Sequence, residues 1–590
     1  MFAKVLVANR GEIAVRIFRT LRDMGIASVA VYSDVDRAAL HPRFADEAFA
    51  LGGSTSAESY LVVEKVLEAA RRSRAEAIHP GYGFLAENAA FAAAVEAAGL
   101  VWIGPPPAAI EQMGSKTVAR RTMQAAGVPI IPGTTEPVAS AAEVAALGDE
   151  LGYPLLLKAA AGGGGKGMKV VRGAGEAEQA LESARREGHA YFADGAVYVE
   201  RYLEDPRHVE VQVLADAHGN VIHLGERDCT IQRRHQKLIE ETPSPAVDEE
   251  LRSRIGAIAV EAARAAGYRS AGTIEGLLTR DGAYYFMEMN TRIQVEHTIT
   301  EVVSGVDIVR AQVQIAAGQK LQFVQDDIRL QGHAIECRIN AEDPTQAFLP
   351  SPGRITAYRE PAGPGVRVDS GVEAGSEVSP LYDPMIAKLI VRGVDREDAI
   401  GRMLRALGEF RIDGVKTLIG FHRALLSHPC FRAGETCDGV VESSELAEAA
   451  ELLSHRTTSL ARPPDGTLSE LATEVEIDGR RVEVKVLTPE PAYRALARRR
   501  RAREVGSAAG PSAATVRSPM QGTVIDVKVA VGDTIASGGV VCIVEAMKME
   551  NEITAHRGGV VAELAVSVGM AVSIGQAICA IDSDGSEPGD

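Results

Sequence analysis

The sequence predicts an α/β protein followed by a separate all-β domain. The first hundred residues alternate apolar strand patterns with helix patterns, and a run of glycines at 162–167 lies between two further strand patterns. Near the carboxyl end, residues 522–545 and 559–582 are two copies of one segment rich in Val, Ile and Gly. Because a single hydrophobic core stops growing at about 250–300 residues, a chain of 590 residues is expected to form several domains.

Composition argues against several classes of protein. The net charge of -17 argues against general affinity for nucleic acid. The amino-terminal segment carries Arg10, Glu12 and Arg16 and is not typical of a secretory signal, and no apolar run reaches the roughly 18 residues of a membrane helix. The six cysteines include no CxxC pair, which indicates free, mostly buried thiols and no zinc site. We therefore expect a cytoplasmic protein that binds neither membrane nor nucleic acid.

The amino-terminal alternation predicts a Rossmann-like domain over residues 1–115. The expected strands are 4–9, 26–33, 77–79 and 100–103, and the expected helices are 12–24, 58–72 and 91–98. Alternation of this kind is typical of a parallel sheet with helices on both faces. The turns at 9–11 and 80–83 follow strands, and parallel sheets bind ligands at this edge.

The glycine run is a candidate phosphate loop. It follows a strand closed by Lys158 and leads into a second strand at 168–171, so it matches neither the dinucleotide-binding motif nor the P-loop, both of which open a helix. Consecutive glycines let backbone N–H groups approach phosphate oxygens, and Lys158, Lys166 and Lys116 add positive charge. The alternative is a flexible hairpin tip without a ligand.

A candidate metal site lies on a predicted hairpin. Strand patterns at 273–278 and 283–289 flank an Asp-Gly turn, which places Glu275 opposite position 287 or 288. Two facing carboxylates destabilise a sheet unless a cation neutralises them, and oxygen ligands favour Mg²⁺ or Mn²⁺.

The second strand of this hairpin is expected to continue to position 296. Five polar residues then alternate with apolar ones and project to one face. They are Glu288, Asn290, Arg292, Gln294 and Glu296. A solvated edge strand would give the same alternation, but five residues able to bind metal, anion or proton favour a site.

The duplicated segment predicts a small all-β barrel of two similar halves. The copies align without a gap, from Gly522 with Gly559 to Cys542 with Cys579. The connection between them contains Ala546-Met547-Lys548-Met549. Lys548 could be an ordinary solvated lysine on a hairpin tip, or a residue that carries a covalent group.

These motifs resemble those of a known family. The segments that carry the resemblance are ANRGEIAVRI (8–17), HPGYGFLAEN (79–88), GGGGKG (162–167), PRHVEVQVLAD (206–216), ERDCTIQRRHQK (226–237), EMNTRIQVEH (288–297) and YDPMIAKL (382–389). Over residues 1–445 the chain resembles biotin carboxylase, an ATP-grasp enzyme. The Ala-Met-Lys-Met sequence resembles the attachment site of biotinyl carrier domains. Together they resemble the α subunit of an actinobacterial-type acyl-CoA carboxylase.

The resemblance implies a fold and domain boundaries. We expect a Rossmann-like domain at 1–115, an ATP-grasp domain with the glycine loop as its lid at 116–330, a carboxyl-terminal α+β domain of the carboxylase at 331–445, a linker or partner-docking region at 446–514, a barrel-sandwich biotinyl domain at 515–583 and a disordered tail at 584–590. The linker region holds a probable hairpin at 474–486, a basic run at 494–503 and a flexible stretch at 506–514.

The resemblance also implies the ligands of each site residue. The expected ATP-binding residues are Lys116, Lys158, Gly162, Gly163, Gly164, Gly165, Lys166, Gly167, Glu200, Leu203, His208, Gln232, His235, Glu275 and Glu288. Glu275, Glu288 and Asn290 would hold Mg²⁺ or Mn²⁺. Bicarbonate would bind Arg292, Gln294 and the backbone of Val295, and biotin would be attached to Lys548.

The catalytic residues implied in this way are Lys237, Arg292, Glu296 and Arg338. Glu296 would deprotonate bicarbonate, which attacks the γ-phosphate of ATP to give carboxyphosphate and ADP. Lys237 would contact bicarbonate or phosphate, and Arg338 would stabilise the developing charge on the biotin oxygen. One departure from the family is Gly276, where a bulky residue is usual, so we expect looser packing behind Glu275.

We therefore expect an enzyme that carboxylates biotin on its own carrier domain with ATP and bicarbonate. A separate carboxyltransferase β subunit would use the carboxybiotin to carboxylate an acyl-CoA of the acetyl or propionyl type, and a biotin protein ligase would attach the biotin. The enzymatic alternative is the amino-terminal part of a pyruvate- or urea-type carboxylase. The other alternative is a non-catalytic carrier scaffold that assembles the β subunit.

Overall fold

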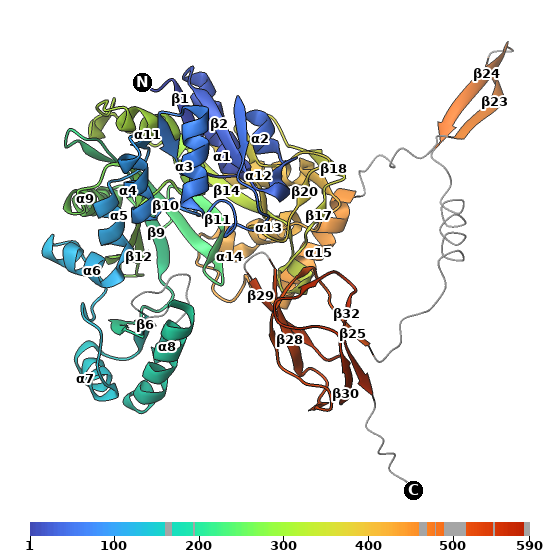
Figure 1. The fold of residues 1–590 in the computed structure, drawn as a ribbon. Coiled ribbons are helices and arrows are strands. Elements are labelled where there is room, and N and C mark those ends of the chain that lie inside the picture. The colour runs from blue at the N-terminus through green and yellow to red at the C-terminus, as the bar shows by residue number, and fades with distance from the viewer. Residues whose placement is uncertain are drawn as a thin grey trace, which may run out of the picture. The chain divides into compact units, whose positions relative to one another are not determined.

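The computed structural model describes residues 1–159, 168–192, 195–458, 469–477, 480–488, 515–546 and 549–582 (Figure 1). The chain divides into two units, Met1–Glu451 and Leu452–Asp590. Among the described residues, no helix is long and apolar enough to cross a membrane. The glycine loop 162–167 with Lys166, the attachment candidate Lys548, the basic run 494–503, the flexible stretch 506–514 and the tail 584–590 lie outside these residues.

The chain begins with a five-stranded parallel sheet in the order β3-β2-β1-β4-β5. Its strands are β1 Lys4–Val7, β2 Ala27–Tyr32, β3 Glu47–Ala50, β4 Ala77–His79 and β5 Val101–Trp102, and its helices are α1 Gly11–Asp23, α2 Leu40–Phe44, α3 Val63–Ser73, α4 Ala89–Ala97 and α5 Pro107–Gly114. Val5 and Val7 belong to one buried cluster with α1, whereas Leu6 belongs to another with α3 and α4. The predicted sheet with helices on both faces is confirmed.

The Asn9 side chain joins the carboxyl ends of β1 and β4. Its amide donates to the carbonyl oxygens of Pro80 and Tyr82, both at 2.7 Å. The two turns predicted at this edge of the sheet are therefore held together.

An eight-stranded antiparallel sheet is the centre of the larger unit. Its order is β13-β12-β9-β10-β11-β14-β21-β19. The strands are β9 Arg207–Ala215, β10 Val221–Arg233, β11 Gln236–Thr242, β12 Ser270–Leu278, β13 Tyr284–Asn290, β14 His333–Asn340, β19 Val366–Ser370 and β21 Met385–Gly393. The sheet is continuous across position 330, where a domain boundary is expected, because β11 pairs with β14.

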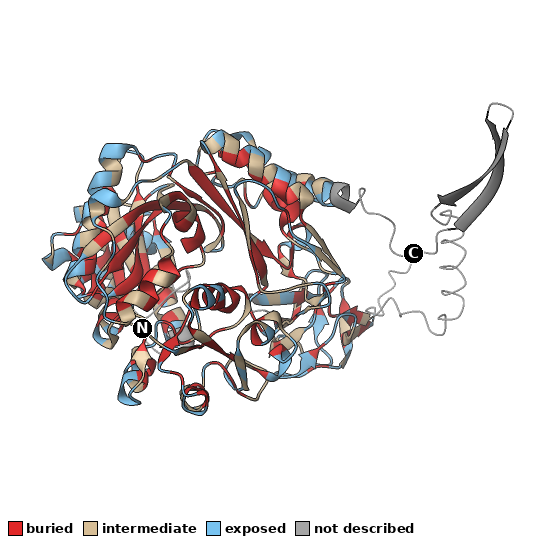
Figure 2. Cartoon of the chain, turned by 90° about the horizontal axis from the view of Figure 1, so that it is seen from above, coloured by how far each residue is buried: buried red, intermediate tan, exposed pale blue. Residues whose placement is uncertain are grey.

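The two faces of this sheet differ in chemistry. Along β9, Val209, Val211 and Val213 pack in a buried cluster with helix α9, Glu249–Ala265. The alternate residues His208 and Glu210 project to the other face, since side chains alternate along a strand. The strands of this sheet are largely buried (Figure 2), so its polar face needs internal partners.

A smaller antiparallel sheet carries the strands on either side of the glycine loop. It is formed by β6 Leu155–Ala159, β7 Met168–Val171 and β8 Val197–Arg201 in the order β7-β6-β8. Helices α7, Ala141–Leu151, and α8, Ala177–Phe192, supply apolar residues to the same buried cluster. The predicted strand–loop–strand context of the glycines is confirmed.

The remaining helices and short strands belong to the larger unit, except that α15 extends past its end at Glu451. The helices are α6 Lys116–Ala125, α10 His297–Ser304, α11 Ile308–Ala316, α12 Arg396–Glu409, α13 Ile419–Ser427, α14 Pro429–Arg432 and α15 Ser444–Thr458, and the short strands are β15 Glu342–Asp343, β16 Leu349–Pro350, β17 Gly353–Arg354, β18 Ala357–Arg359, β20 Glu377–Val378 and β22 Arg411–Asp413. β17 pairs with β20, and β18 pairs with β22.

The expectation of six free cysteines is also wrong. Cys430 and Cys437 form a disulfide, with their Cα atoms 5.6 Å apart. A turn at Gly434 reverses the chain between them, and the amide of Glu435 donates to the carbonyl of Cys430 at 2.9 Å. The turn brings together two cysteines that are seven residues apart in the sequence, whereas Cys229, Cys337, Cys542 and Cys579 are free and buried.

The second unit contains a hairpin and a duplicated β domain. The hairpin, β23 Ser469–Ile477 and β24 Arg480–Thr488, confirms the predicted one. The β domain has two four-stranded sheets, β25-β32-β30-β27 and β29-β28-β26-β31. Its strands are β25 Thr515–Arg517, β26 Gly522–Val527, β27 Thr534–Ile535, β28 Val540–Ala546, β29 Met549–Thr554, β30 Gly559–Leu564, β31 Ala571–Val572 and β32 Ala577–Asp582.

Strand pairing confirms the duplication. In one half Thr523 pairs with Glu545, and in the other half the equivalent Val560 pairs with Asp582. The glycines at the start of each copy, Gly522 and Gly559, lie where two strands approach closely. The alignment of the copies therefore corresponds to a repeated backbone geometry.

Alanine at Gly522 or Gly559 is expected to destabilise this domain by about 1–3 kcal/mol, since overpacking forces the backbone apart. The new methyl group would lie 2.4 Å from the carbonyl oxygen of Glu545 or 2.1 Å from that of Asp582. Hydrogen exchange of peptides from this domain in the full chain measures the effect. Gly558→Ala is the control, because its nearest neighbour would be 3.5 Å away; equal protection in all three variants would contradict the prediction.

Candidate functional site

The site begins with three glutamates that lie side by side across neighbouring strands. Glu288 on β13 pairs with Glu275 on β12, which pairs with Glu210 on β9. The prediction that Glu275 lies opposite position 287 or 288 is therefore confirmed. Glu210 in turn pairs with Arg227 on β10, so the carboxylate row, Glu288, Glu275 and Glu210, ends on an arginine.

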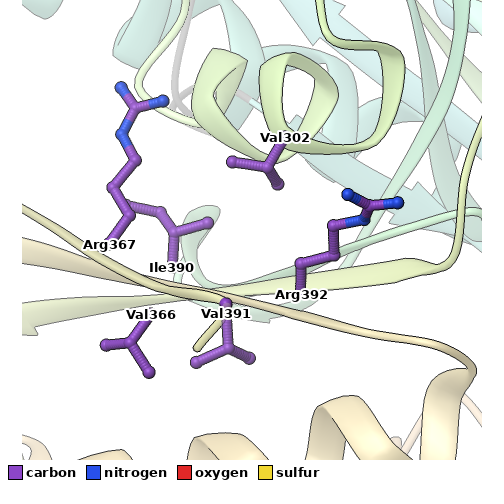
Figure 3. Close-up of a pocket in the computed structure, with 7 residues that line it drawn as sticks. Val302, Val366, Arg367, Ile390, Val391 and Arg392 are labelled. Atoms are coloured by element: carbon purple, nitrogen blue, oxygen red, sulfur yellow. The ribbon is translucent and has the colours of Figure 1, made fainter. Parts of the chain in front are cut away.

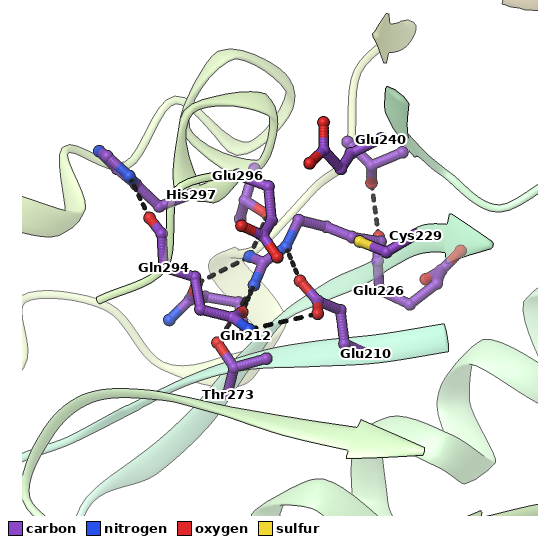
Figure 4. Close-up of polar contacts among 12 residues, drawn as sticks. Glu210, Gln212, Glu226, Cys229, Glu240, Thr273, Gln294, Glu296 and His297 are labelled. Atoms are coloured by element: carbon purple, nitrogen blue, oxygen red, sulfur yellow. Dashed lines mark hydrogen bonds and ion pairs between the residues drawn. The ribbon is translucent and has the colours of Figure 1, made fainter. Parts of the chain in front are cut away.

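Arg227 is fully buried and makes five side-chain hydrogen bonds. Its Nε donates to Glu210 Oε1 at 2.6 Å, and its two amino groups donate to Gln212, Thr273, Gln294 and Thr300 at 2.5–3.1 Å. Figure 4 shows Glu210, Gln212, Thr273 and Gln294 pointing toward one another. Sequence reasoning missed this role, and the signal that could have found it is an arginine beside an acid within the ERDC segment.

Lys237 lies among three carboxylates. Its ammonium donates to Glu210 at 2.5 Å, to Glu296 at 2.7 Å and to Glu275 at 2.9 Å. Burial lowers the pKa of Lys237, but the three carboxylates outweigh burial and raise that pKa well above its ordinary value. Lys237 is therefore cationic throughout the physiological pH range.

A β-bulge turns Lys237 toward the site. Between β10 and β11 the register shifts, so that Ile231 pairs with Ile239 and the next residue, Gln232, pairs with Lys237. The extra residue places Lys237 on the same face as Glu240, as bulges do where a side chain must be redirected.

Glu296 lies between two cations. Its carboxylate accepts from Lys237 at 2.7 Å and from Arg338 at 3.0 Å. Burial raises the pKa of Glu296, but the positive charges of Lys237, Arg338 and Arg227 lower it by more than burial raises it. The pKa of Glu296 therefore lies well below its ordinary range. Glu296 is therefore ionised at neutral pH. The guanidinium of Arg338 also donates to Glu240 at 2.6 Å.

The expected strand from 288 to 296 is wrong beyond Asn290. There β13 ends, the amide of Thr291 donates to Glu87 at 3.0 Å, and α10 begins at His297. β13 is the edge strand of the sheet, and its pairing with β12 ends at Asn290 opposite Thr273, so this ladder does not hold the chain extended beyond that point. The side chains converge by a turn and not by alternation along a strand.

The residues after β13 still reach the site. Gln294 donates to Glu275 at 2.6 Å, and the Val295 carbonyl accepts from Lys388 at 2.8 Å. Arg292 instead donates to Glu87 at 2.9 Å and to the Asn290 side chain at 2.6 Å. Glu87 and Lys388 were not among the predicted site residues.

Some of the residues expected to bind nucleotide contact one another, around Glu200 and around Glu275. Lys158 pairs with Glu200 at 2.6 Å, and buried Arg120 also contacts this glutamate. Leu203 is 8% exposed. His208, on β9, lies 2.9 Å from Glu275. Burial lowers the pKa of His208, but Glu275 outweighs burial and raises it.

The hairpin tip between β10 and β11 has an unusual backbone. Arg234 and His235 both have positive φ, at 47° and 64°. Non-glycine residues rarely adopt this conformation, and it is concentrated at functional sites. Gln232, beside the tip, donates to the Cys229 carbonyl at 2.7 Å.

The residues expected to hold a metal fit a divalent cation. Burial and the facing charge of Glu275 raise the pKa of Glu288, and the ammonium of Lys116 is 3.9 Å from its carboxylate. A cation between Glu275 and Glu288 would relieve this repulsion, with Asn290 as a further oxygen ligand. Two other groups with donor atoms within 4.8 Å of one another are His208–Glu210–Glu275 and Glu210–Cys229–Glu296.

Gly276 does not leave the expected gap. The ring of Tyr284 fills the space, and a Cβ atom at Gly276 would lie 2.3 Å from it. Tyr284 is buried and its hydroxyl donates to the Val209 carbonyl at 3.3 Å. The ring of Tyr284 on the paired strand β13 therefore occupies the space that a bulky side chain at position 276 would fill.

A separate pocket lies between α10 and the strands β19 and β21 (Figure 3). Its lining is Val302, Gly365, Val366, Arg367, Ile390, Val391 and Arg392. None of the predicted site residues lines it, so the chemistry assigned to the site does not extend to this pocket.

Comparisons with known proteins agree with this geometry. Family models match as the biotin carboxylase amino-terminal domain at 1–110, the carbamoyl-phosphate synthase L chain ATP-binding domain at 115–324, the biotin carboxylase carboxyl-terminal domain at 336–443 and the biotin-requiring enzyme domain at 514–581. A biotin-dependent acyl-coenzyme A carboxylase alpha3 subunit from Mycobacterium leprae is 48% identical over 96% of each chain. The chain belongs to the biotin carboxylase family.

Solved structures support the assignment. A biotin carboxylase from Campylobacter jejuni, crystallised as a beta-gamma-ATP complex, is 47% identical with a TM-score of 0.72, over 74% of this chain and 98% of that one. The biotin carboxylase domain of the Hydrogenobacter thermophilus 2-oxoglutarate carboxylase is 46% identical with a TM-score of 0.71, over 78% and 99%. The predicted ATP-grasp fold, its biotinyl domain and the resemblance to acyl-CoA carboxylase α subunits are confirmed. The protein is an ATP-dependent biotin carboxylase with its own carrier domain.

Replacing Arg227 by Met is expected to destabilise the larger unit by about 3–5 kcal/mol, because removing one partner leaves a buried charge uncompensated. Chemical denaturation of the full chain, followed by a signal from this unit, measures the change. Arg264→Met on α9 is the matched control, since Arg264 is 55% exposed and its ion pair with Glu261 is 3.8 Å long. Similar stability of the two variants would contradict the role assigned to Arg227.

Proposed function

We propose that the site activates bicarbonate with ATP through Glu296 and passes the carboxyl group to biotin on Lys548. The observation that supports this proposal is an ionised, buried Glu296 held between the cations Lys237 and Arg338. A carboxylate in this state can accept a proton, and the cations beside it can stabilise an anion.

In the first step, bicarbonate is the nucleophile. Its proton moves to Glu296 while its oxygen forms a bond to the γ-phosphorus of ATP, and the bond to ADP breaks. The products are carboxyphosphate and ADP. Arg292 and Gln294 would position the anion, because both lie beside the carboxylate row. Gln294 donates to Glu275 of the row, and Arg292 donates to Asn290, two residues after Glu288.

In the second step, carboxyphosphate separates into carbon dioxide and phosphate. The phosphate takes the ureido proton of biotin, and the nitrogen attacks carbon dioxide. Negative charge develops on the ureido oxygen, and Arg338 would stabilise it by donating a charge-assisted hydrogen bond. Lys237 would stay beside the phosphate or bicarbonate, because its pKa keeps it cationic.

A divalent cation, Mg²⁺ or Mn²⁺, would be held by Glu275, Glu288 and Asn290 and would neutralise phosphate charge. The chain itself contributes Lys116 and Lys158 near the nucleotide phosphates, and His208 as a third cationic contact. Gln232, His235, Glu200 and Leu203 would shape the nucleotide pocket, and the glycines 162–167 would cover it.

The acceptor of the carboxyl group is proposed to be an acyl-CoA on a separate carboxyltransferase β subunit. The name of the Mycobacterium leprae relative supports this step. A biotin protein ligase would load Lys548. The alternative, a carrier scaffold without activity, conflicts with the complete set of Lys237, Glu296 and Arg338 around one point.

The decisive experiment is bicarbonate-dependent release of ADP by the purified chain with ATP, Mg²⁺ and free biotin. Glu296→Gln is expected to lower turnover about 10²- to 10⁴-fold, the usual contribution of a positioned base. The side chain of Glu296 makes no capping bond to α10, so the helix should persist. Glu249→Ala, at a largely exposed position, is the control.

Two outcomes would contradict the proposal. Absence of ADP release from the folded wild type favours the scaffold, and wild-type turnover in Glu296→Gln removes this residue as the base. ATP affinity should be retained in the variant, because Glu296 has no predicted contact with the nucleotide.

Lys548→Arg is expected to abolish biotinylation while the fold of the carrier domain is kept. The neighbouring β28 and β29 pair up to Ala546 and Met549, so the attachment candidate lies between paired strands in the sequence. Intact-mass measurement after co-expression with a biotin ligase tests it. Lys528→Arg, at a half-exposed lysine of the same domain, is the control, and biotin that remains on the Lys548 variant would identify another lysine.

A further inference from the structure

Two buried glutamates face each other beside Arg338. Glu240 on β11 pairs directly with Glu336 on β14, and neither side chain is exposed. Arg338 follows two residues after Glu336 and therefore projects from the same face of the sheet. The described mechanism uses neither glutamate.

Each glutamate has one oxygen with a partner and one without. Glu240 Oε1 accepts from Arg338 Nε at 2.6 Å, and Glu336 Oε2 accepts from the hydroxyl of Thr298. Glu240 Oε2 and Glu336 Oε1 are both buried and have no hydrogen-bond partner among the described residues. Directly opposed side chains in an antiparallel sheet have Cβ atoms about 4.5–5.5 Å apart, a separation at which the carboxyl groups of two glutamates can meet.

Two ionised carboxylates in this arrangement would repel each other without solvent. Burying polar oxygens without partners is costly, and one proton between them provides the missing hydrogen bond. Burial raises the pKa of both groups, to about 7 for Glu240 and well above its ordinary range for Glu336. Because Arg338 is paired with Glu240, the proton belongs on Glu336.

The titratable groups around the pair come from four parts of the chain. Arg338 and the thiol of Cys337 are on β14, Lys237 is on β11, Glu296 precedes α10, and Lys388 on β21 lies opposite Arg338. Glu296 raises the pKa of Glu240. Lys388 lowers the pKa of Glu336, but burial outweighs this effect, so the pKa of both glutamates remains raised.

We propose that Glu240 and Glu336 share a single proton and that this protonated pair positions Arg338 for the reaction. Glu240 holds the Nε edge of the guanidinium, while the proton on Glu336 keeps the pair at one negative charge. A second negative charge would neutralise Arg338 further and weaken its hold on an anionic oxygen. The inference rests on the proposed function, which gives Arg338 that task.

Matched amide variants separate the two glutamates. Gln at 336 imitates the protonated acid, so Glu336→Gln should keep kcat and the KM for free biotin within about twofold at pH 7. Glu240→Gln removes the anionic partner of Arg338 and should lower kcat/KM for biotin about 10- to 100-fold, the usual cost of losing a supporting partner. The KM for ATP should change in neither variant, and Glu240→Asp should recover part of the loss.

The proposal also predicts how kcat/KM for biotin changes with pH. The wild type should lose kcat/KM for biotin as the pH rises and the shared proton is released, whereas Glu336→Gln should lack this alkaline limb. Losses of equal size in Glu336→Gln and Glu240→Gln, or an alkaline limb unchanged in Glu336→Gln, would overturn the proposal.

Infrared difference spectroscopy on the full chain gives a readout that needs no activity. A protonated-carboxyl stretch should be present in the wild type at pH 7, disappear at alkaline pH and be missing from Glu336→Gln. If that variant does not fold, the same band should shift in Glu240→Gln. Absence of such a band overturns the shared proton, whereas a band with the predicted behaviour in a chain that releases no ADP overturns only the proposed function.

Discussion

The contact between Arg227 and the carboxylate row is the interaction on which the site depends. Glu210, Glu275 and Glu288 lie on three adjacent strands, and Glu210 is fully buried against the guanidinium. An uncompensated buried charge costs several kcal/mol, a large part of the 5–15 kcal/mol by which a protein is stable. The row can therefore exist only because cations are placed along it.

The sheet register decides which cations meet which acids. The pairing of β10 with β9 brings Arg227 to one end of the row, and the bulge in β11 turns Lys237 to the same face. Arg338 arrives from β14, after the predicted boundary at 330, so the site draws on a sheet that joins both halves of the carboxylase. The result is an ionised Glu296 in a place where an acid would otherwise be protonated.

Several features of the fold could be read from the sequence because they depend on neighbouring residues. Alternation of strands and helices predicted the parallel sheet, and the Asp-Gly turn placed Glu275 opposite Glu288. The gapless alignment of the two copies predicted equivalent strand pairs in the carrier domain. By contrast, the period-two pattern at 288–296 was misleading, since β13 lies at the edge of the sheet, its pairing with β12 ends at Asn290 and the chain turns away there. The gap expected at Gly276 is filled by Tyr284, which only the pairing of the two strands brings there.

The sequence by itself determined the family, the order of its parts and the residue types that can perform the chemistry. It did so because these properties are carried by short motifs and by the local periods of strands and helices. Only the tertiary structure decided that Arg227 holds the acids together, that Cys430 meets Cys437 and that Glu240 faces Glu336. The proximity of these residues depends on strand register, bulges and turns, and burial then shifts the pKa of their ionisable groups. The residue pattern of a single strand shows neither which residues become neighbours nor how deeply they are buried.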